Sequence, residues 1–330
     1  KVTSGSVQTN SSYYTSFALP YFTELAKRNW PVDIVAGHFY PKADRFTDGR
    51  YEQLIMMRND LIKAGLPANK ELWDTEVNMA PATTKTYTAE ENSAAVTRTY
   101  LDTLRAGYSR AYWYMFTDYY LSFLKVPMTP GSTAATTLKR LQNKIIGATF
   151  NGCTTIGTFI SCGFVKNGES FAYSWAETGS VQAKLSYPQQ VCSTYTTVCT
   201  QRSNAVMLTG TPILTSEKLT PVPTLPAQPG TPTASAAGGG VATISIPAST
   251  QQTYPLTSGY RVDFLDSRSP IWRTAIVNTG SASRTITVSG LNTVSSYKFR
   301  VAALNAVGTS TFSTISNPVI LQTPPWAARS

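Results

Sequence analysis

The chain has 330 residues, of which 42% are hydrophobic and only 14% are charged, so it is long and apolar enough for two or three domains with substantial cores. The formal charge is +10, but the longest basic segment, residues 138–144, fits the solvated face of a helix, and we expect no nucleic-acid partner. The absence of a run of about 20 apolar residues excludes a membrane-spanning helix.

The first 145 residues alternate between helical and strand patterns, which predicts an α/β fold with a parallel sheet. Residues 32–41 form a continuous apolar run, as expected for a parallel strand. Thr88 and Glu91 form a capping box, and Gly65 favours the end of the preceding helix. The predicted helices are 12–30, 50–65, 88–107 and 133–148, and the predicted strands are 32–41, 70–79 and 110–120.

From residue 146 the pattern changes to short strands separated by Gly, Asn and Ser turns, which predicts an antiparallel β-sandwich over 146–218. Asn167-Gly168 is a hairpin signal within it. All four cysteines lie in this region, and their spacing fits no zinc site, so no metal or cofactor is expected. Two local disulfides, Cys153–Cys162 and Cys192–Cys199, are the favoured arrangement, and four free buried thiols are the alternative.

Residues 219–229 are rich in proline and are predicted to form a stiff extended linker. The following unit, 230–325, alternates strand patterns and resembles a fibronectin type III domain, with Leu291 and Tyr297 at the positions of the family's corner leucine and tyrosine. The early-strand tryptophan of that family is absent. The resemblance implies a β-sandwich whose tyrosine bonds back to the backbone, and it says little about function.

Polar and aromatic side chains follow the three predicted strands of the first region, at the ends where active-site residues gather in parallel α/β barrels. They are His38 and Tyr40, Glu76 and Asn78, and Trp113 and Asp118. Because strand side chains alternate, Leu72, Asp74 and Glu76 are expected on one face. A buried carboxylate is costly unless it is paired, so Glu76 needs an explanation.

The stretch Trp73-Asp74-Thr75-Glu76 matches a W-x-T-E motif, and His38-Phe39-Tyr40 matches His-x-Tyr on the preceding strand. Residues 1–215 thereby resemble the second half of a retaining (β/α)8-barrel glycoside hydrolase with its accessory sandwich. The resemblance implies that Glu76 is the nucleophile, Tyr40 its hydrogen-bond donor, Trp113 a sugar platform and His38 a subsite residue.

The resemblance implies a partial TIM barrel made of strands five to eight. The acid/base of these hydrolases lies in an Asn-Glu pair on strand four, and no such pair precedes His38. Four parallel strands cannot close a barrel, so we expect this chain to be the C-terminal part of a longer protein, or a partner chain to supply the rest.

Each residue has a structural alternative. Glu76 could be a strand-end acid paired with an arginine, and His38, Tyr40 and Trp113 could be core residues. Asp118 is favoured as a solvated loop acid, and Asn10-Ser11-Ser12 matches a glycosylation acceptor that also arises by chance.

The sequence therefore predicts a secreted or cell-surface retaining glycoside hydrolase that acts on a poly- or oligosaccharide. The main alternative is a non-catalytic scaffold with a hydrolase-like fold in a cell-surface or filamentous assembly. A weaker third possibility is a protein that binds sugar without turnover.

Overall fold

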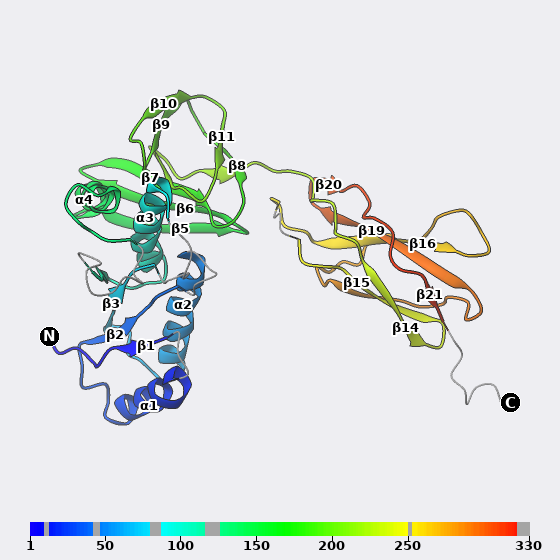
Figure 1. The fold of residues 1–330 in the computed structure, drawn as a ribbon, viewed down its shortest axis with the longest axis horizontal. Coiled ribbons are helices and arrows are strands. Elements are labelled where there is room, and N and C mark those ends of the chain that lie inside the picture. Colours follow the sequence, from blue (N-terminus) through cyan, green and yellow to red (C-terminus); the bar gives the residue numbers. More distant parts are fainter. Residues whose placement is uncertain (10–12, 42–46, 80–86, 116–125, 250–252, 322–330) are drawn as a thin grey trace. The chain divides into compact units, whose positions relative to one another are not determined.

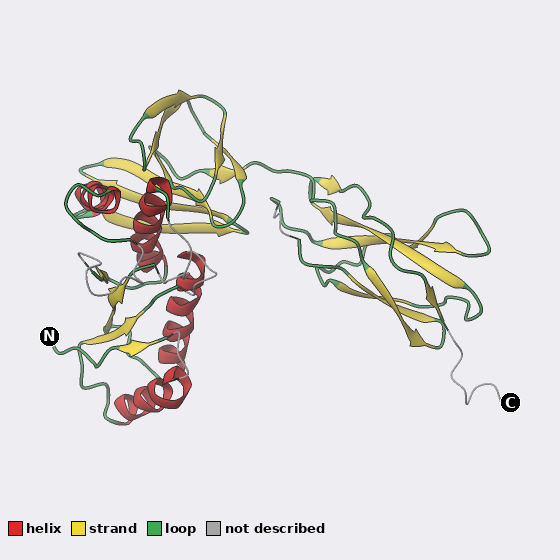
Figure 2. Ribbon diagram, viewed as in Figure 1, coloured by secondary structure: helices red, strands yellow, loops and turns green. Residues whose placement is uncertain are grey.

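The computed structural model describes residues 1–9, 13–41, 47–79, 87–115, 126–249 and 253–321, so the predicted Asp118 and Asn10-Ser11-Ser12 sites lie outside the described residues. The chain divides into two compact units. The first comprises Lys1–Thr155 and Phe159–Thr220, and the second comprises Ile156–Thr158 and the chain from Pro221 onward. Every helix of the described chain lies in the first unit (Figure 2).

A four-stranded parallel sheet forms the N-terminal part of the first unit, with its strands in the order β1-β2-β3-β4. This confirms the predicted parallel α/β arrangement. Figure 1 labels the first three of these strands. The strands are β1 (Val7–Gln8), β2 (Ile34–His38), β3 (Glu71–Val77) and β4 (Arg110–Trp113). The helical segments are a π-helical turn η1 (Tyr14–Ala18), α1 (Leu19–Lys27), α2 (Thr47–Lys63), α3 (Ala89–Arg105) and α4 (Thr133–Ile145).

One face of this sheet is covered by α2. Leu72 of β3 packs in one hydrophobic cluster with Leu54, Met57 and other apolar residues of α2. A side chain on Gly37 of β2 would come within 2.9 Å of the Met57 sulfur, so the close approach of α2 requires glycine there. On the opposite face, Trp73 remains partly exposed, and so does His38.

The C-terminal part of the first unit consists of two antiparallel sheets, as predicted. The larger has the order β10-β9-β12-β7-β6-β5, and the smaller β11-β8-β13. The strands are β5 (Thr149–Ile156), β6 (Phe159–Lys166), β7 (Glu169–Ala176), β8 (Val181–Lys184), β9 (Gln189–Ser193), β10 (Cys199–Arg202), β11 (Ala205–Leu208), β12 (Ile213–Thr215) and β13 (Thr220–Pro221).

Both predicted disulfides are present. Cys153–Cys162 joins β5 to β6, and Cys192–Cys199 joins β9 to β10. The Asn167-Gly168 hairpin is also confirmed, because Lys166 and Glu169 are register partners and both turn residues have positive φ.

The helices and the β-sheets of the first unit share contacts. Leu101 of α3 and Leu141 of α4 lie in one cluster with Phe164 and Trp175. The segments 1–145 and 146–218, predicted as two domains, therefore form one compact unit.

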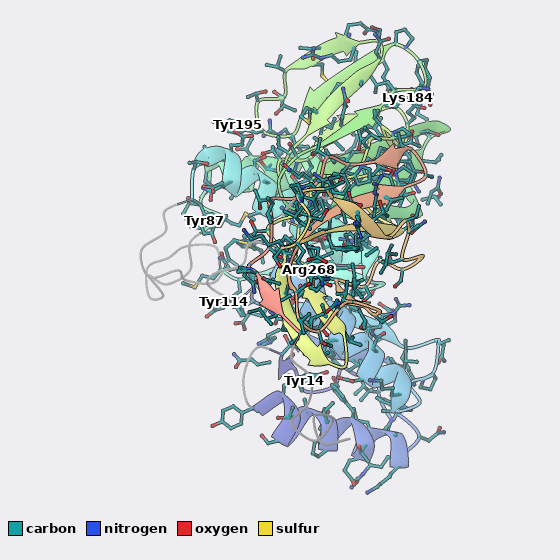
Figure 3. All side chains as sticks on the ribbon, turned by 90° about the vertical axis from the view of Figure 1, so that its right-hand side faces the viewer. Tyr14, Tyr87, Tyr114, Lys184, Tyr195 and Arg268 are labelled. Atoms are coloured by element: carbon teal, nitrogen blue, oxygen red, sulfur yellow. A yellow bond between two sulfur atoms is a disulfide. The ribbon has the colours of Figure 1, made fainter. Side chains whose placement is uncertain are left out.

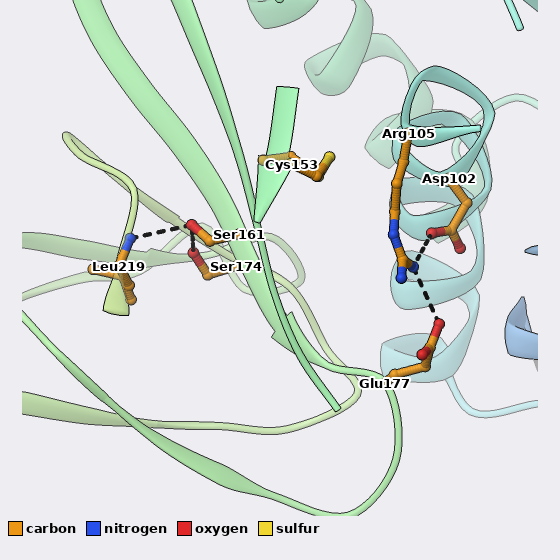
Figure 4. The surroundings of a disulfide bond; sticks show 8 residues. Asp102, Arg105, Cys153, Ser161, Ser174, Glu177 and Leu219 are labelled. Atoms are coloured by element: carbon orange, nitrogen blue, oxygen red, sulfur yellow. Dashed lines mark hydrogen bonds and ion pairs between the residues drawn. A yellow bond between two sulfur atoms is a disulfide. The ribbon is translucent and has the colours of Figure 1, made fainter. Parts of the chain in front are cut away.

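Figure 4 shows two polar links in this part of the fold. Arg105 of α3 bonds to Asp102 at 3.3 Å and to Glu177, which follows β7, at 3.2 Å. Ser161 and Ser174 are hydrogen-bonded at 2.8 Å across β6 and β7.

The second unit is a sandwich of a three-stranded sheet, β14-β15-β18, and a five-stranded sheet, β17-β16-β19-β20 with β21 beside β19. Its strands are β14 (Thr233–Gly238), β15 (Val241–Ser245), β16 (Gly259–Asp266), β17 (Arg273–Ile276), β18 (Thr285–Val288), β19 (Ser296–Asn305), β20 (Gly308–Thr309) and β21 (Val319–Ile320). The Tyr297 hydroxyl accepts a hydrogen bond of 2.8 Å from the Asn292 N–H, which is the predicted tyrosine corner.

The proline-rich segment 219–229 contains β13 and bonds to the sandwich of the second unit. The carbonyl of Thr224 accepts from the Asn305 amide at 2.8 Å, and Gln228 donates to the Phe312 carbonyl at 2.5 Å. Among the helices described, none combines the length and the hydropathy needed to cross a membrane.

Candidate active site

The ends of β2 and β3 bring three of the predicted site residues together. The Tyr40 hydroxyl donates a 2.5 Å hydrogen bond to Oε1 of Glu76, and Nδ1 of His38 lies 3.6 Å from Oε2. The Glu76 side chain is 28% exposed, so the carboxylate is held by neighbours and is still reachable from solvent. A phenol, an imidazole and a carboxylate thus form one cluster.

A register shift in β3 determines where Glu76 points. Gly37 pairs with Asp74 and the next residue, His38, pairs with Glu76, so Thr75 is an extra residue in the ladder. Glu76 consequently lies on the His38 side, whereas Asp74 lies on the side of α2. The prediction that Leu72, Asp74 and Glu76 share one face is wrong for Glu76, because the alternation is interrupted at Thr75.

Asp74 forms a buried ion pair beneath the cluster. Its Oδ2 lies 2.5 Å from Nη2 of Arg50, and both side chains are fully buried. Arg50 also donates to the Thr103 hydroxyl at 2.7 Å and to the Thr99 carbonyl at 3.0 Å. Burial raises the pKa of Asp74 to about 7, and Arg50 opposes this increase.

The alternative for Glu76 was a structural acid paired with an arginine. Within the part of the chain that the structure describes, Arg50 pairs with Asp74, and no arginine pairs with Glu76. Arg50 is therefore paired with a different carboxylate, two residues away from Glu76.

Tyr40 is fixed as a hydrogen-bond donor. Burial, followed by its hydrogen bond to Glu76, raises the pKa of Tyr40 well above the usual value of a phenol, so the hydroxyl stays protonated. The backbone carbonyl of Tyr40 accepts a 2.7 Å hydrogen bond from the side-chain amide of Gln53 of α2. The side-chain oxygen of Gln53 accepts in turn from the Thr9 hydroxyl at 2.5 Å.

Gln53 was not among the predicted site residues, although its position offered a signal. It precedes Met57 and Leu61 at helical spacing, so a polar residue occupies the core-facing side of α2. Only 6% of Gln53 is exposed. A buried amide at such a position needs partners, and here it holds the backbone of Tyr40.

Trp113 lies away from the cluster. Its indole N–H donates a 2.9 Å hydrogen bond to the Val126 carbonyl, and its ring packs against a helix-side cluster that includes Met79 and Val96. Its register partner Val77 is fully buried. The Trp113 side chain therefore occupies a packing position.

Tyr114 is the aromatic residue of this strand end that the sequence interpretation missed. It is partly exposed and is labelled in Figure 3. Its hydroxyl contributes electrostatically to the raised pKa of Tyr40, which places it near the Tyr40–Glu76 pair. The signal was its position, because Tyr114 directly follows the end of β4.

Asn78 is fully buried and has a structural role. Its side chain donates to the Val126 carbonyl at 3.2 Å and accepts from the Val126 N–H at 3.3 Å. In the described part of the chain, no three acidic, histidine or cysteine side chains gather in a way that could hold a metal ion.

Comparison with known proteins identifies one domain. Residues 227–319 match the family model of the fibronectin type III domain, so the second unit contains such a domain, as predicted. No curated protein matches the chain.

Among solved structures, the twitchin kinase region from C. elegans is 19% identical to this chain over the aligned part. The alignment covers 30% of this chain and 17% of that chain, with a TM-score of 0.27. Titin module A71 from human cardiac muscle is 27% identical, with coverages of 29% and 91% and a TM-score of 0.25. A family 39 glycoside hydrolase from the gut symbiont Bacteroides cellulosilyticus WH2 is 15% identical, with coverages of 58% and 46% and a TM-score of 0.44.

Proposed function

We propose that this protein is a retaining glycoside hydrolase whose nucleophile is Glu76. The observation that carries the proposal is the Tyr40–Glu76 hydrogen bond of 2.5 Å at the ends of adjacent parallel strands, with His38 beside the other carboxylate oxygen. A nucleophilic carboxylate needs to be ionised, oriented and accessible, and this arrangement supplies a donor for one oxygen while the side chain remains partly exposed.

In the proposed reaction, one Glu76 oxygen attacks the anomeric carbon of the sugar and the glycosidic C–O bond breaks. The leaving oxygen takes a proton from a carboxylic acid about 5–5.5 Å from the nucleophile. Water then attacks the glycosyl ester, gives its proton to the same carboxylate and releases Glu76. We assign the acid/base to a residue outside those described here.

We further propose that β1 to β4 are part of a (β/α)8 barrel. Parallel sheets are normally covered on both faces, and in the described chain helices cover only the face bearing Leu72 and Asp74. A barrel would enclose the other face, where His38 and Glu76 lie. Tyr114 is a better candidate than Trp113 for the sugar platform, because an aromatic ring near the nucleophile can stack on a pyranose.

The proposed localisation is the cell exterior. Two disulfides and a fibronectin type III domain are compatible with a secreted or surface protein. A poly- or oligosaccharide is the proposed substrate.

The test is to measure hydrolysis of aryl glycosides by the protein carrying this sequence, with and without Glu76→Gln. The variant keeps the size of the side chain and should lose turnover. Glu71→Gln is the matched control, because Glu71 is on the same strand with a side chain 29% exposed, against 28% for Glu76. Full activity of the Glu76→Gln variant would remove Glu76 from the mechanism.

The fibronectin type III domain favours a second candidate, a non-catalytic scaffold in a surface assembly, because such modules often act as spacers. A wild-type protein that neither binds nor hydrolyses sugars would support that candidate, whereas sugar binding without any product would support a sugar-binding protein.

A further inference from the structure

A cavity of about 230 Å³ lies in the first unit, apart from the Glu76 cluster. Thr97 of α3, Arg140 and Lys144 of α4, and Tyr173 of β7 contribute to its wall. The hairpin of β9 and β10 closes another side through Ser193, Thr194, Thr197 and the Cys192–Cys199 disulfide. Figure 3 labels Tyr195, which follows Thr194 in this hairpin.

The wall of this cavity is positively charged. Arg140 and Lys144 are one helical turn apart, and no acidic residue is among the lining residues. Over the described ranges, neither cation forms an ion pair with a carboxylate, and the Lys144 ammonium lies 4.8 Å from the centre of the Phe171 ring, a contact that a carboxylate in the cavity would compete with. Arg140 donates to the Thr137 hydroxyl at 3.4 Å, and its Nε is buried with no hydrogen-bond partner there. An unpaired guanidinium in a cavity is suited to a carboxylate.

A second, independent observation is the hydroxyl of Thr97. Thr97 is only 1% exposed, and within the described residues its Oγ1 has no hydrogen-bond partner. A helical threonine often donates to the carbonyl four residues earlier, and Thr97 does not. Buried hydroxyls are seldom left unpaired. The Thr97 oxygen is covered in the ligand-free chain, so a ligand bonds to it once the neighbouring wall side chains shift aside.

The remaining wall is apolar and of limited size. Leu141, Leu214 and Tyr173 provide apolar contact area, and the hairpin adds further hydroxyls. The volume exceeds the share of about 30 Å³ of one water and is below the range of about 300 Å³ and more that is typical of drug-sized ligands. A ring with one carboxylate, several hydroxyls and an apolar face fits these walls.

We propose that this cavity binds a sugar acid, a single pyranose ring that carries a carboxylate. Arg140 and Lys144 bind the carboxylate, the Thr97 hydroxyl bonds to a ring hydroxyl, and the apolar wall contacts the C–H face of the ring. The site shares no residue with the Glu76 cluster and does not depend on the proposed function.

Calorimetric titration of the protein with D-glucuronate tests the proposal. We expect saturable binding of D-glucuronate, with an affinity that is at least tenfold weaker in Arg140→Gln and in Thr97→Val. D-glucose, which lacks the carboxylate, should not bind in this way. Lys139→Gln is the matched control, because it removes one exposed positive charge from the same helix without touching the cavity. Glu76→Gln should bind D-glucuronate as the wild type does.

Absence of saturable binding would overturn the proposal, and so would equal binding by Arg140→Gln. Equal affinity for benzoate or inorganic sulfate would also contradict it, because the sugar hydroxyls would then contribute nothing. Circular dichroism checks that each variant is folded. If Arg140→Gln fails to fold, Lys144→Gln provides the same test.

Discussion

Glu76 and Asp74 are two residues apart on β3, yet Asp74 is fully buried against Arg50 and Glu76 is partly exposed beside Tyr40. The extra residue Thr75 separates the two carboxylates onto opposite faces. Asp74 is thereby held in a buried ion pair, and Glu76 is reachable from solvent. Two carboxylates, two positions apart, thus have different surroundings, and surroundings of this kind can give carboxylates different roles.

Removing the Tyr40 hydroxyl should impair turnover without changing the fold. Tyr40→Phe deletes the 2.5 Å hydrogen bond to Glu76 and keeps the ring. A hydrogen bond to a charged group contributes about 1.5–3 kcal/mol, so we expect kcat/KM to fall about tenfold to a hundredfold. Steady-state kinetics measures this, and Tyr112→Phe, an exposed tyrosine of β4, is the control. An unchanged kcat/KM would contradict the role given to Tyr40.

Asp102 should make stability depend on pH. Burial raises the pKa of Asp102 to about 6, with Arg98, Arg105 and Arg50 opposing the increase and Glu177 adding to it. Because this pKa is higher in the folded state than in the unfolded state, the folded chain binds more protons between about pH 4 and about pH 6. The contribution of Asp102 to the free energy of unfolding is therefore fully present below about pH 4, and it is lost as the pH rises through 6.

Asp102→Asn cannot titrate and should lack this slope. Urea unfolding at several pH values between about 4 and 7 measures the free energy of unfolding of both proteins. As the pH rises, the free energy of unfolding of the wild type should fall relative to that of the variant. A difference that is constant across this range would show that Asp102 has an ordinary pKa.

The sequence was sufficient to predict that His38, Tyr40 and Glu76 lie together at neighbouring strand ends, because all three stand at fixed distances from apolar runs. It was not sufficient for the side chains that depend on register. Strict alternation placed Glu76 with Asp74, and only the pairing of β2 with β3 reveals the shift at Thr75. The packing of Trp113 was also not readable from the sequence, because its contacts with Met79, Val96 and the Val126 carbonyl come from distant segments.

At the scale of elements, α3 begins at the capping box that the sequence predicts. The Thr88 hydroxyl accepts from the Glu91 N–H at 3.2 Å, and the Glu91 carboxylate accepts from the Thr88 N–H at 2.9 Å. Short-range patterns of this kind are readable because both partners lie within one turn of helix.

Replacing the cap should destabilise the first unit. Thr88→Ala removes one of the two reciprocal bonds, and loss of such a cap costs about 1 kcal/mol. Chemical denaturation followed by circular dichroism measures the loss. Thr136→Ala, an exposed threonine within α4, is the control and should change stability little. Equal effects of the two substitutions would show that the cap contributes nothing specific.

The boundary near residue 146 illustrates what local patterns miss. The sequence pattern does change from helical to strand-like there. Nevertheless, Leu101 and Leu141 of the helices and Trp175 of the strands belong to one hydrophobic cluster. Periodicity identifies which side of a helix is apolar, and it does not identify what that side packs against. Local patterns therefore do not reveal that residues of both segments share one hydrophobic cluster.

At the scale of the whole molecule, the chain divides into two compact units that should unfold separately. Tyr297→Phe removes the hydrogen bond to Asn292 in the fibronectin type III domain and should cost about 1 kcal/mol. Differential scanning calorimetry of the full chain should show two transitions. Tyr297→Phe should lower the midpoint of one, and Thr88→Ala the midpoint of the other. A single transition that both substitutions shift would contradict this division.

The most direct test of the central claim is covalent trapping of the nucleophile. Dinitrophenyl 2-deoxy-2-fluoro-glycosides have a leaving group that needs little acid catalysis, so they react with the nucleophile even when the acid/base contributes little. After incubation with a panel of these sugars, peptide mass spectrometry locates the attached glycosyl group. The account predicts one label on Glu76 that is absent from Glu76→Gln, whereas a label on a different carboxylate would contradict it.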